Sequence, residues 1–146
     1  MNDSNKSGFT LIELAFVMVV IGIVLAFSIP MYRNLTQTSQ LKGAAENIAA
    51  QLRLAREKAI ATGQSQTMHF TPNYPPGTDC DYHIHNGAVV GPCWALPNGI
   101  SFFSSVAPTM FSDGRSNGSG TIVLQDQRGH QATVSVQTSG LVLVGQ

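Results

Sequence analysis

The feature that most constrains this chain is an apolar stretch of 23 residues, Phe9–Met31, that carries one charged side chain, Glu13. As a helix rising about 1.5 Å per residue, the stretch would extend about 30 Å, which matches the hydrocarbon thickness of a bilayer. A carboxylate deep in such a helix costs about 2.5–3.5 kcal/mol on insertion scales unless a partner offsets its charge. We therefore predict that this stretch is a membrane helix and that Glu13 has a functional partner.

A cleaved secretory signal is the competing interpretation of the same stretch. Ala26-Phe27-Ser28 has the small-x-small form of a signal cleavage site. However, the preceding residues are not basic overall, because Asp3 and Lys6 cancel, and the apolar run continues past Ser28. These features favour an anchor that is retained.

The residues around Glu13 resemble the processing site of type IV prepilins and the related pseudopilins. The chain reads Lys-Ser-Gly-Phe-Thr-Leu-Ile-Glu-Leu over positions 6–14. In that family a short polar leader ends in glycine and is followed by phenylalanine, Thr-Leu-Ile-Glu and an apolar helix. The resemblance implies that a prepilin peptidase cleaves after Gly8 on the cytoplasmic face and that Phe9 is then N-methylated.

The same resemblance implies three segments, which are a cleaved leader over 1–8, a membrane and assembly helix over 9–30, and a periplasmic domain over 31–146. Gly22 and Pro30 stand where the family places a flexible glycine and a kinking proline. Proline lacks a backbone N–H and glycine weakens a helix, so we expect the helix to kink or loosen near Phe27–Pro30.

Removal of the leader would give Glu13 a specific electrostatic role. Cleavage after Gly8 leaves a free amine on Phe9, four residues before Glu13. Because filament subunits are staggered along the axis, Glu13 of one subunit could pair with the Phe9 amine of its neighbour, and the pairing would offset the desolvation of both charges. We predict that Glu13 sets the register between subunits.

The pattern after this helix predicts an α+β fold. Apolar residues recur at alternating spacings of four and three, which indicates an amphipathic helix that ends at Gly63. The members of this stripe are Leu41, Ala45, Ile48, Leu52, Ala55 and Ala59. Short alternating runs bounded by glycine, proline or asparagine then indicate an antiparallel sheet packed on the helix. These runs are Gln66–Thr71, Tyr82–Val90, Ile100–Phe103, Thr121–Gln125, Ala132–Val136 and Leu141–Val144.

A second resemblance lies in the C-terminal half. Phe111-Ser112-Asp113-Gly114, Arg128-Gly129 and Ser139-Gly140 are similar to the pattern of the H-type pseudopilin of type II secretion and the FimT/FimU-like minor pilins. The resemblance implies a structural minor subunit that assembles into or primes a secretion pseudopilus or a type IV pilus, near the tip. A membrane-anchored enzyme would need a convergent catalytic group, and the sequence shows none, so an enzyme is not expected. Its implied partners are other pilins or pseudopilins, the prepilin peptidase and N-methyltransferase, the inner-membrane assembly platform and membrane lipid. The implied location is a single pass in the inner membrane, then a periplasmic pseudopilus or an extracellular pilus.

The alternative function is a minor pilin that binds DNA for uptake or serves in adhesion. Its candidate residues are Arg53, Arg56, Lys58, Arg115 and Arg128. Eight basic and eight acidic side chains cancel over the whole chain, and Leu141-Val142-Leu143 follows Gly140 where some DNA-binding relatives carry arginines. These departures argue against a nucleic-acid partner.

Cys80 and Cys93 are the two cysteines of the chain. A disulfide between them would suit a periplasmic or extracellular domain and would pin a surface hairpin, whereas two free thiols also fit the spacing.

Two aspartates and two histidines occupy every second position from Asp79 to His85. If Asp79, Asp81, His83 and His85 lay on one strand, they would share a face. His83 and His85 are weak candidates for a metal site, and a polar outer face is the simpler interpretation. His69 and His130 are isolated in the sequence and are expected to be ordinary strand residues. Neither a catalytic arrangement nor a cofactor site is expected.

Overall fold

The computed structural model describes residues 10–70, 80–87 and 89–145, apart from the side chains at 27–35 and 89–90. The chain divides into two compact units, Met1–Thr36 and Gln37–Gln146. Helix α1 (Leu11–Thr62) supplies the secondary structure of the first unit and continues into the second. The helix ends where Gly63 adopts a φ of 70°, as the sequence predicts for a glycine C-cap.

The first unit presents apolar side chains to its surroundings. Exposed residues follow one another along the helix, from Leu11 at 87% exposed to Leu25 at 57%. Across the parts of the chain that are described, no helix combines the length and mean hydropathy needed to cross a membrane. The backbone stays helical through Gly22 and Pro30, and the loosening expected near Phe27–Pro30 stays a prediction.

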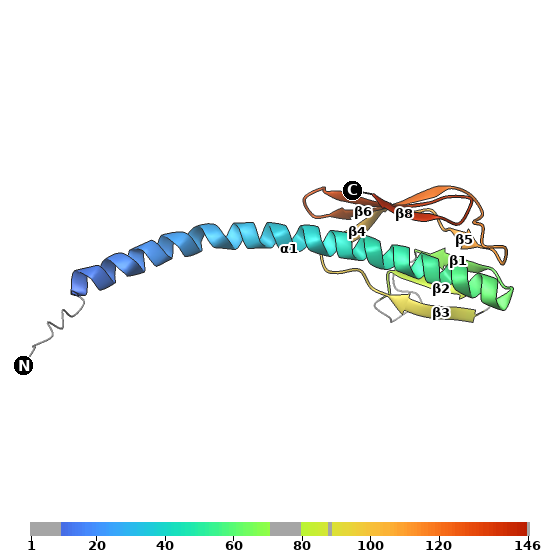
Figure 1. Cartoon of the computed structure of the whole chain (residues 1–146), viewed down its shortest axis with the longest axis horizontal. Coiled ribbons are helices and arrows are strands. Elements are labelled where there is room, and N and C mark those ends of the chain that lie inside the picture. The colour runs from blue at the N-terminus through green and yellow to red at the C-terminus, as the bar shows by residue number, and fades with distance from the viewer. Residues whose placement is uncertain (1–9, 71–79, 88, 146) are drawn as a thin grey trace, which may run out of the picture. The chain divides into compact units, whose positions relative to one another are not determined.

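The second unit contains two antiparallel four-stranded sheets (Figure 1). The first has the order β3-β2-β1-β5 and the second the order β4-β6-β7-β8. The first sheet contains β1 (Gln66–His69), β2 (Tyr82–Asn86), β3 (Val89–Trp94) and β5 (Thr109–Met110). The second contains β4 (Ile100–Ser104), β6 (Gly120–Asp126), β7 (Gln131–Val136) and β8 (Val142–Gly145).

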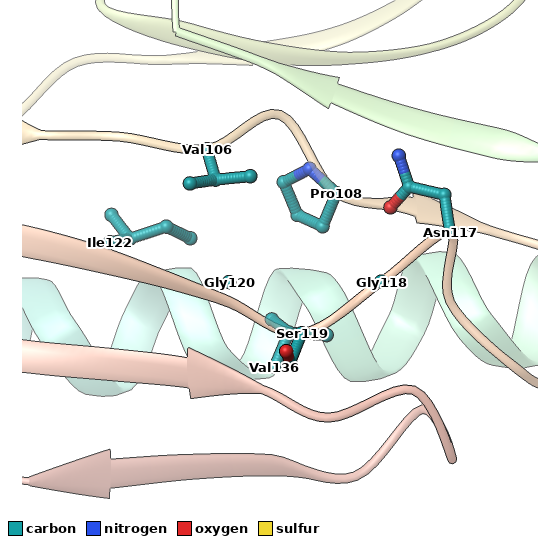
Figure 2. Close-up of a pocket in the computed structure, with 8 residues that line it drawn as sticks. All are labelled: Val106, Pro108, Asn117, Gly118, Ser119, Gly120, Ile122 and Val136. Atoms are coloured by element: carbon teal, nitrogen blue, oxygen red, sulfur yellow. The ribbon is translucent and has the colours of Figure 1, made fainter.

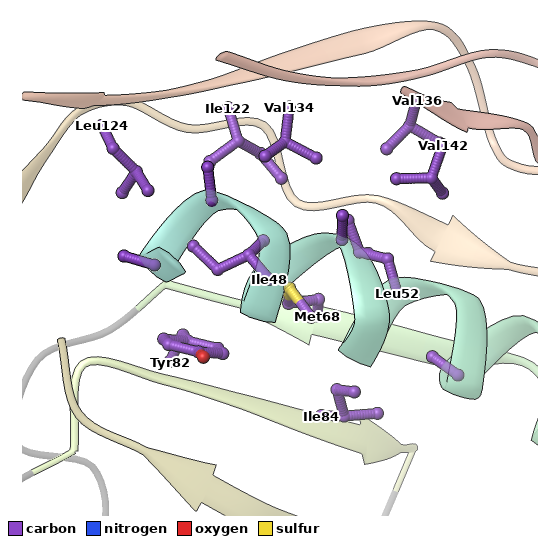
Figure 3. Close-up of a cluster of buried hydrophobic side chains, with 14 of the residues drawn as sticks. Ile48, Leu52, Met68, Tyr82, Ile84, Ile122, Leu124, Val134, Val136 and Val142 are labelled. Atoms are coloured by element: carbon purple, nitrogen blue, oxygen red, sulfur yellow. The ribbon is translucent and has the colours of Figure 1, made fainter. Parts of the chain in front are cut away.

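The C-terminal half of α1 lies between the two sheets and contributes to one core with both (Figure 3). All six members of the predicted stripe are buried, from Leu41 at 3% exposed to Ala45, Ile48, Leu52 and Ala59 at 0%. Met68, Tyr82 and Ile84 meet this face from the first sheet. Its contacts from the second sheet are made by Ile122, Leu124, Val134, Val136 and Val142. The alanines of the helix leave room for this close packing on two sides.

The predicted α+β class is confirmed, but two details of the strands were wrong. One sheet was expected, and the structure has two. The run Tyr82–Val90 was expected to be one strand, whereas the structure has a hairpin in which β2 ends at Asn86 and Gly87 adopts a φ of 67°. The Asn-Gly pair at 86–87 is a strong local hairpin signal that the alternation of side chains obscured.

Candidate functional site

The start of α1 forms a reciprocal cap between Thr10 and Glu13. The Thr10 backbone N–H and hydroxyl each donate to Glu13 Oε2 at 2.9 Å, and the Glu13 N–H donates to the Thr10 hydroxyl at 3.4 Å. This is the capping box that Thr-x-x-Glu encodes, and it satisfies N–H groups that have no partner within a helix. Sequence reasoning treated Glu13 only as an intersubunit group, although the same four residues carry the capping signal.

Glu13 is exposed and is surrounded on α1 by exposed apolar residues. Ile12 is 77% exposed, Leu14 is 60% and Phe16 is 70%. Between Leu11 and Leu25, α1 therefore carries one carboxylate among exposed apolar side chains, where a packed neighbour would remove it from water. The predicted processing residues, Gly8 and Phe9, lie outside the described residues.

Arg56 joins α1 to two turns of the second unit. Its Nε donates to the carbonyl oxygen of Gly114 at 2.7 Å. A Cβ built on Gly140 would collide with the Gly114 carbonyl oxygen and would lie 2.8 Å from Arg56 Nε. The two glycines thus let two turns and one guanidinium approach closely, and Gly114 and Gly140 are both buried.

These turns share one backbone design. Gly114 N–H donates to the Phe111 carbonyl at 2.9 Å, and Phe111 N–H donates to the Arg115 carbonyl at 2.8 Å. Residues 126–130 and 137–141 repeat the same pair of bonds, with Gly129 and Gly140 in the position of Gly114. Each is a three-residue hairpin loop that ends in a residue with positive φ. The glycines quoted for the second resemblance are therefore the positions that this turn requires.

The five basic residues considered for DNA binding are divided among several environments. Arg53 Nη2 donates to the Val142 carbonyl at 3.2 Å, as Arg56 does to Gly114. Arg115 pairs with Asp113 at 2.8 Å on the surface. Arg128 lies in the β6–β7 turn, at the opposite end of its sheet from Gly140, because β6 and β7 run antiparallel. Lys58 is exposed on α1.

Cys80 and Cys93 are joined by a disulfide that ties the start of β2 to β3. Backbone pairing continues this connection, since His83 lies opposite Cys93 and Tyr82 lies opposite Trp94. The bond encloses a hairpin at the edge of the first sheet, as the sequence suggested for a bonded pair.

Reduction of this disulfide is expected to lower the stability of the domain. In the chain-entropy account, a loop of this size contributes about 3 kcal/mol to the free energy of unfolding. Replacing both Cys80 and Cys93 by serine should lower the midpoint of thermal unfolding accordingly. The oxidised and reduced wild-type chains provide the matched comparison, and identical midpoints for all three samples would contradict the prediction.

Three histidine rings meet on the first sheet, where His83 is buried and His69 and His85 are half-buried. The rings of His69 and His83 are 5.6 Å apart between centroids, and those of His69 and His85 are 4.3 Å apart. The expectation that His69 is isolated was wrong, because β1 pairs with β2 in a register that places His69 opposite His83. That pairing joins residues distant in sequence, which single-strand alternation does not report.

The described residues do not form a metal-binding group around the histidine cluster. Within residues 10–70, 80–87 and 89–145, no group of three His, Cys, Asp or Glu side chains is placed to hold a metal ion. Of the two aspartates considered, Asp81 accepts the Leu96 N–H at 2.6 Å, and Asp79 lies outside the described residues. The weak metal hypothesis for His83 and His85 therefore gains no support.

The cluster makes stability depend on pH. Burial, and then repulsion from His85, lower the pKa of His69; burial, and then repulsion from His69 and His85, lower the pKa of His83. The unfolded chain therefore binds more protons, and the free energy of unfolding should fall as pH decreases through the ordinary histidine range near about 6.5. Thermal unfolding of wild type and His83→Gln between about pH 7.5 and 5.5 tests this. Equal slopes for the two proteins would contradict it.

His130 is also not isolated. Its Nδ1 lies 2.8 Å from Asp126 Oδ2, and Asp126 Oδ1 accepts the Arg128 and His130 N–H groups at 2.8 and 2.9 Å. The contact with the His130 side chain is the main reason that the pKa of Asp126 is lowered, since these bonds favour the charged carboxylate. The group closes the β6–β7 turn and so has a structural role.

A cavity of about 180 Å³ lies beside the start of β6 (Figure 2). Val106 and Pro108 border it on one side, and Gly120 and Ile122 border it on the other. All eight lining residues are uncharged, so the cavity presents neither a carboxylate nor a basic group for acid–base chemistry.

A long helix that begins with an apolar, singly charged segment and ends in the core of antiparallel sheets defines a pilin-like protein. Two family patterns match the chain. The prokaryotic N-terminal methylation motif covers residues 3–29, and the type II transport protein GspH family covers residues 44–140. The chain belongs to the GspH family.

Individual proteins are similar to parts of the chain. Two fimbrial proteins of Pseudomonas aeruginosa are each 40% identical over 67 residues, which cover 46% of this chain and 43% of the relative. The chain thus spans less than half the length of these relatives. The minor pseudopilin EpsH of the Vibrio cholerae type 2 secretion system has a similar fold, with a TM-score of 0.54 and 16% identity over 73% of this chain and 96% of EpsH. The predicted pilin-like family and its minor pseudopilin branch are confirmed, and the matches give no support to the DNA-binding alternative.

Proposed function

We propose that this chain is a structural minor pseudopilin that a type II secretion system processes and assembles into its pseudopilus. The match to the GspH family over residues 44–140 carries this proposal. In it, residues 1–8 are the leader, residues 9–30 anchor the chain in the inner membrane, and residues 31–146 form the periplasmic domain. The disulfide between Cys80 and Cys93 suits that oxidising compartment.

The proposal also assigns partners to the leader and to the apolar part of α1. Prepilin peptidase removes the leader after Gly8 and methylates Phe9, and the methylation motif over residues 3–29 supports this step. The exposed apolar surface of α1 then packs against other pseudopilins as the assembly platform withdraws the helix from lipid. The role of the chain is therefore mechanical, and its surface chemistry serves contacts between subunits.

Processing and co-assembly can be tested in one host that carries a secretion system. Wild type should have the mass of an N-methylated chain that begins at Phe9, and it should co-purify with other pseudopilins. Gly8→Val should keep its full mass and be absent from the assembly, because the bulky side chain blocks the cleavage site. Ser7→Ala is the matched leader control and should be processed. A wild-type chain that begins near Ile29, or that is processed without joining other pseudopilins, would contradict the proposal.

A further inference from the structure

Strand β8 is an edge of the second sheet, and its outward-facing backbone groups can be identified. Gln137 N–H donates to the Leu141 carbonyl at 2.9 Å, so residue 141 directs its carbonyl toward β7. Since hydrogen-bonded and non-hydrogen-bonded pairs alternate in an antiparallel ladder, Val142 and Val144 direct their N–H and C=O groups away from β7. The Arg53 side chain agrees with this outward direction of the Val142 carbonyl, because Arg53 Nη2 donates to it from outside the sheet at 3.2 Å.

This edge has few of the features that prevent strand addition. Natural sheets protect their edges with charged residues, prolines, bulges or very short strands. Residues 131–146 contain neither a charge nor a proline, and β8 pairs with β7 in an unbroken register. Leu141 and Leu143 are 49% and 45% exposed. The protection that remains is the length of β8, four residues, and the Arg53 side chain on the Val142 carbonyl.

The surface beside the edge favours an acidic partner. A groove of about 210 Å³ runs between α1 and β8 and is lined by Arg53, Arg56, Glu57, Gly140, Leu141 and Val142. Two guanidinium groups and one carboxylate line this groove. Arg53 is exposed and Arg56 is half-buried, so both can reach an incoming acidic group while each holds a backbone carbonyl.

We propose that β8 binds an extended segment of a different protein as an added strand, with an acidic residue of that segment facing Arg53 and Arg56. The Val144 N–H and carbonyl supply main-chain hydrogen bonds, and Leu141 and Leu143 supply apolar contact, whereas Val142 is buried and its carbonyl already accepts from Arg53. The proposal rests on the proposed function only for the source of the segment, which is another subunit of the same assembly. The edge itself can be tested without that assembly.

The direct test uses the full chain in detergent micelles and an end-blocked peptide, Thr-Val-Glu-Val-Thr-Val, carrying a fluorophore. Fluorescence anisotropy should report saturable binding, and hydrogen exchange should slow at the Val144 amide. A peptide with lysine in place of glutamate should bind at least about tenfold more weakly, as expected for loss of a charge-assisted hydrogen bond.

Two variants test the two parts of the edge. Val144→Pro removes an outward N–H and should weaken binding about threefold to tenfold, while the ladder to β7 is kept. Arg53→Gln should weaken binding of the acidic peptide by about tenfold. Lys58→Gln is the matched control on α1, since Lys58 does not line the groove, and it should bind as wild type does. If Val144→Pro unfolds at a lower temperature than wild type, the proposal is judged from the binding of Arg53→Gln and from the hydrogen-exchange data.

Three outcomes would overturn the proposal. These are no binding of the peptide, protection confined to the edges formed by β3, β4 or β5, and protection of β8 by a concentration-dependent dimer without peptide. The last result would assign the edge to a second copy of this chain. Because Gly8→Val blocks processing without altering β8, loss of co-assembly alone would bear on the proposed function and not on the edge.

Discussion

Replacing Gly140 by alanine is expected to lower the free energy of unfolding by about 4 kcal/mol or more, the largest stability change predicted for this chain. Gly140 has a φ of 77°, a conformation that costs an L-residue about 1–2 kcal/mol. Its new Cβ would also meet the Gly114 carbonyl oxygen and Arg56 Nε, so that two turns and a helix side chain must separate. Backbone atoms cannot move aside as a flexible side chain could.

Thermal unfolding measures this effect, and the midpoint should fall by more than about 10 °C. Gly118→Ala is the matched control, because its Cβ would have no neighbour within 4 Å and its φ is not positive. It should melt within about 2 °C of wild type. Equal midpoints for the two variants would show that the junction of Arg56, Gly114 and Gly140 does not hold the turns together.

The helix could be predicted from the sequence because its evidence is local. Alternating spacings of four and three placed Ile48, Leu52 and their companions on one face, and that face is the buried one. Gly63 marked the helix end for an equally local reason, its positive φ. Such signals lie within a few residues of the structure they report.

The sheets could be predicted only in part, because strand pairing joins distant residues. Alternation located several strands, but it does not state which strand lies beside which. The pairing of β1 with β2 brings His69 to His83, and the order β4-β6-β7-β8 separates one set of strands from the other. A division into two sheets, with a helix between them, depends on these contacts across the chain and leaves no pattern within a single segment.

Roles of single residues were partly hidden because one residue type can serve two purposes. The sequence predicts a surface charge at Arg56. In the structure, Arg56 donates to the Gly114 carbonyl, because two tight turns approach the helix there. Thr10 reads as part of a processing motif, but it also caps α1. A search for Thr-x-x-Glu before an apolar run would have found the second role.

Two physical roles now compete for Glu13, and they can be separated. In the first, its negative charge pairs with the Phe9 amine of a neighbouring subunit. In the second, its oxygen atoms cap the helix through Thr10, at 2.9 Å from the backbone N–H and from the hydroxyl. A glutamine can also act in a capping box, because it still offers a side-chain oxygen to the N-cap N–H. Only the first role therefore requires the charge.

We expect Glu13→Gln to enter the membrane and to lose its leader, but to join the filament at least about tenfold less than wild type, as loss of a desolvated charge pair implies. Thr10→Val removes the hydroxyl cap, worth about 1 kcal/mol, and keeps the carboxylate. It should assemble within about threefold of wild type. Co-purification with other pseudopilins, normalised to the processed chain in the membrane, measures both variants.

The pattern of the two results is decisive because the predictions are opposite. If the cap were the purpose of Glu13, Thr10→Val would impair assembly and Glu13→Gln would be tolerated. If the charge sets the register, Glu13→Gln fails because an uncompensated Phe9 amine must then be buried in an apolar bundle, where each unpaired ion costs several kcal/mol. The cap itself is compatible with a charge that sets the register. In that case the cap holds the carboxylate at the first turn of α1 while the subunit is alone, and release to a neighbour's amine would exchange hydrogen bonds for a charge pair.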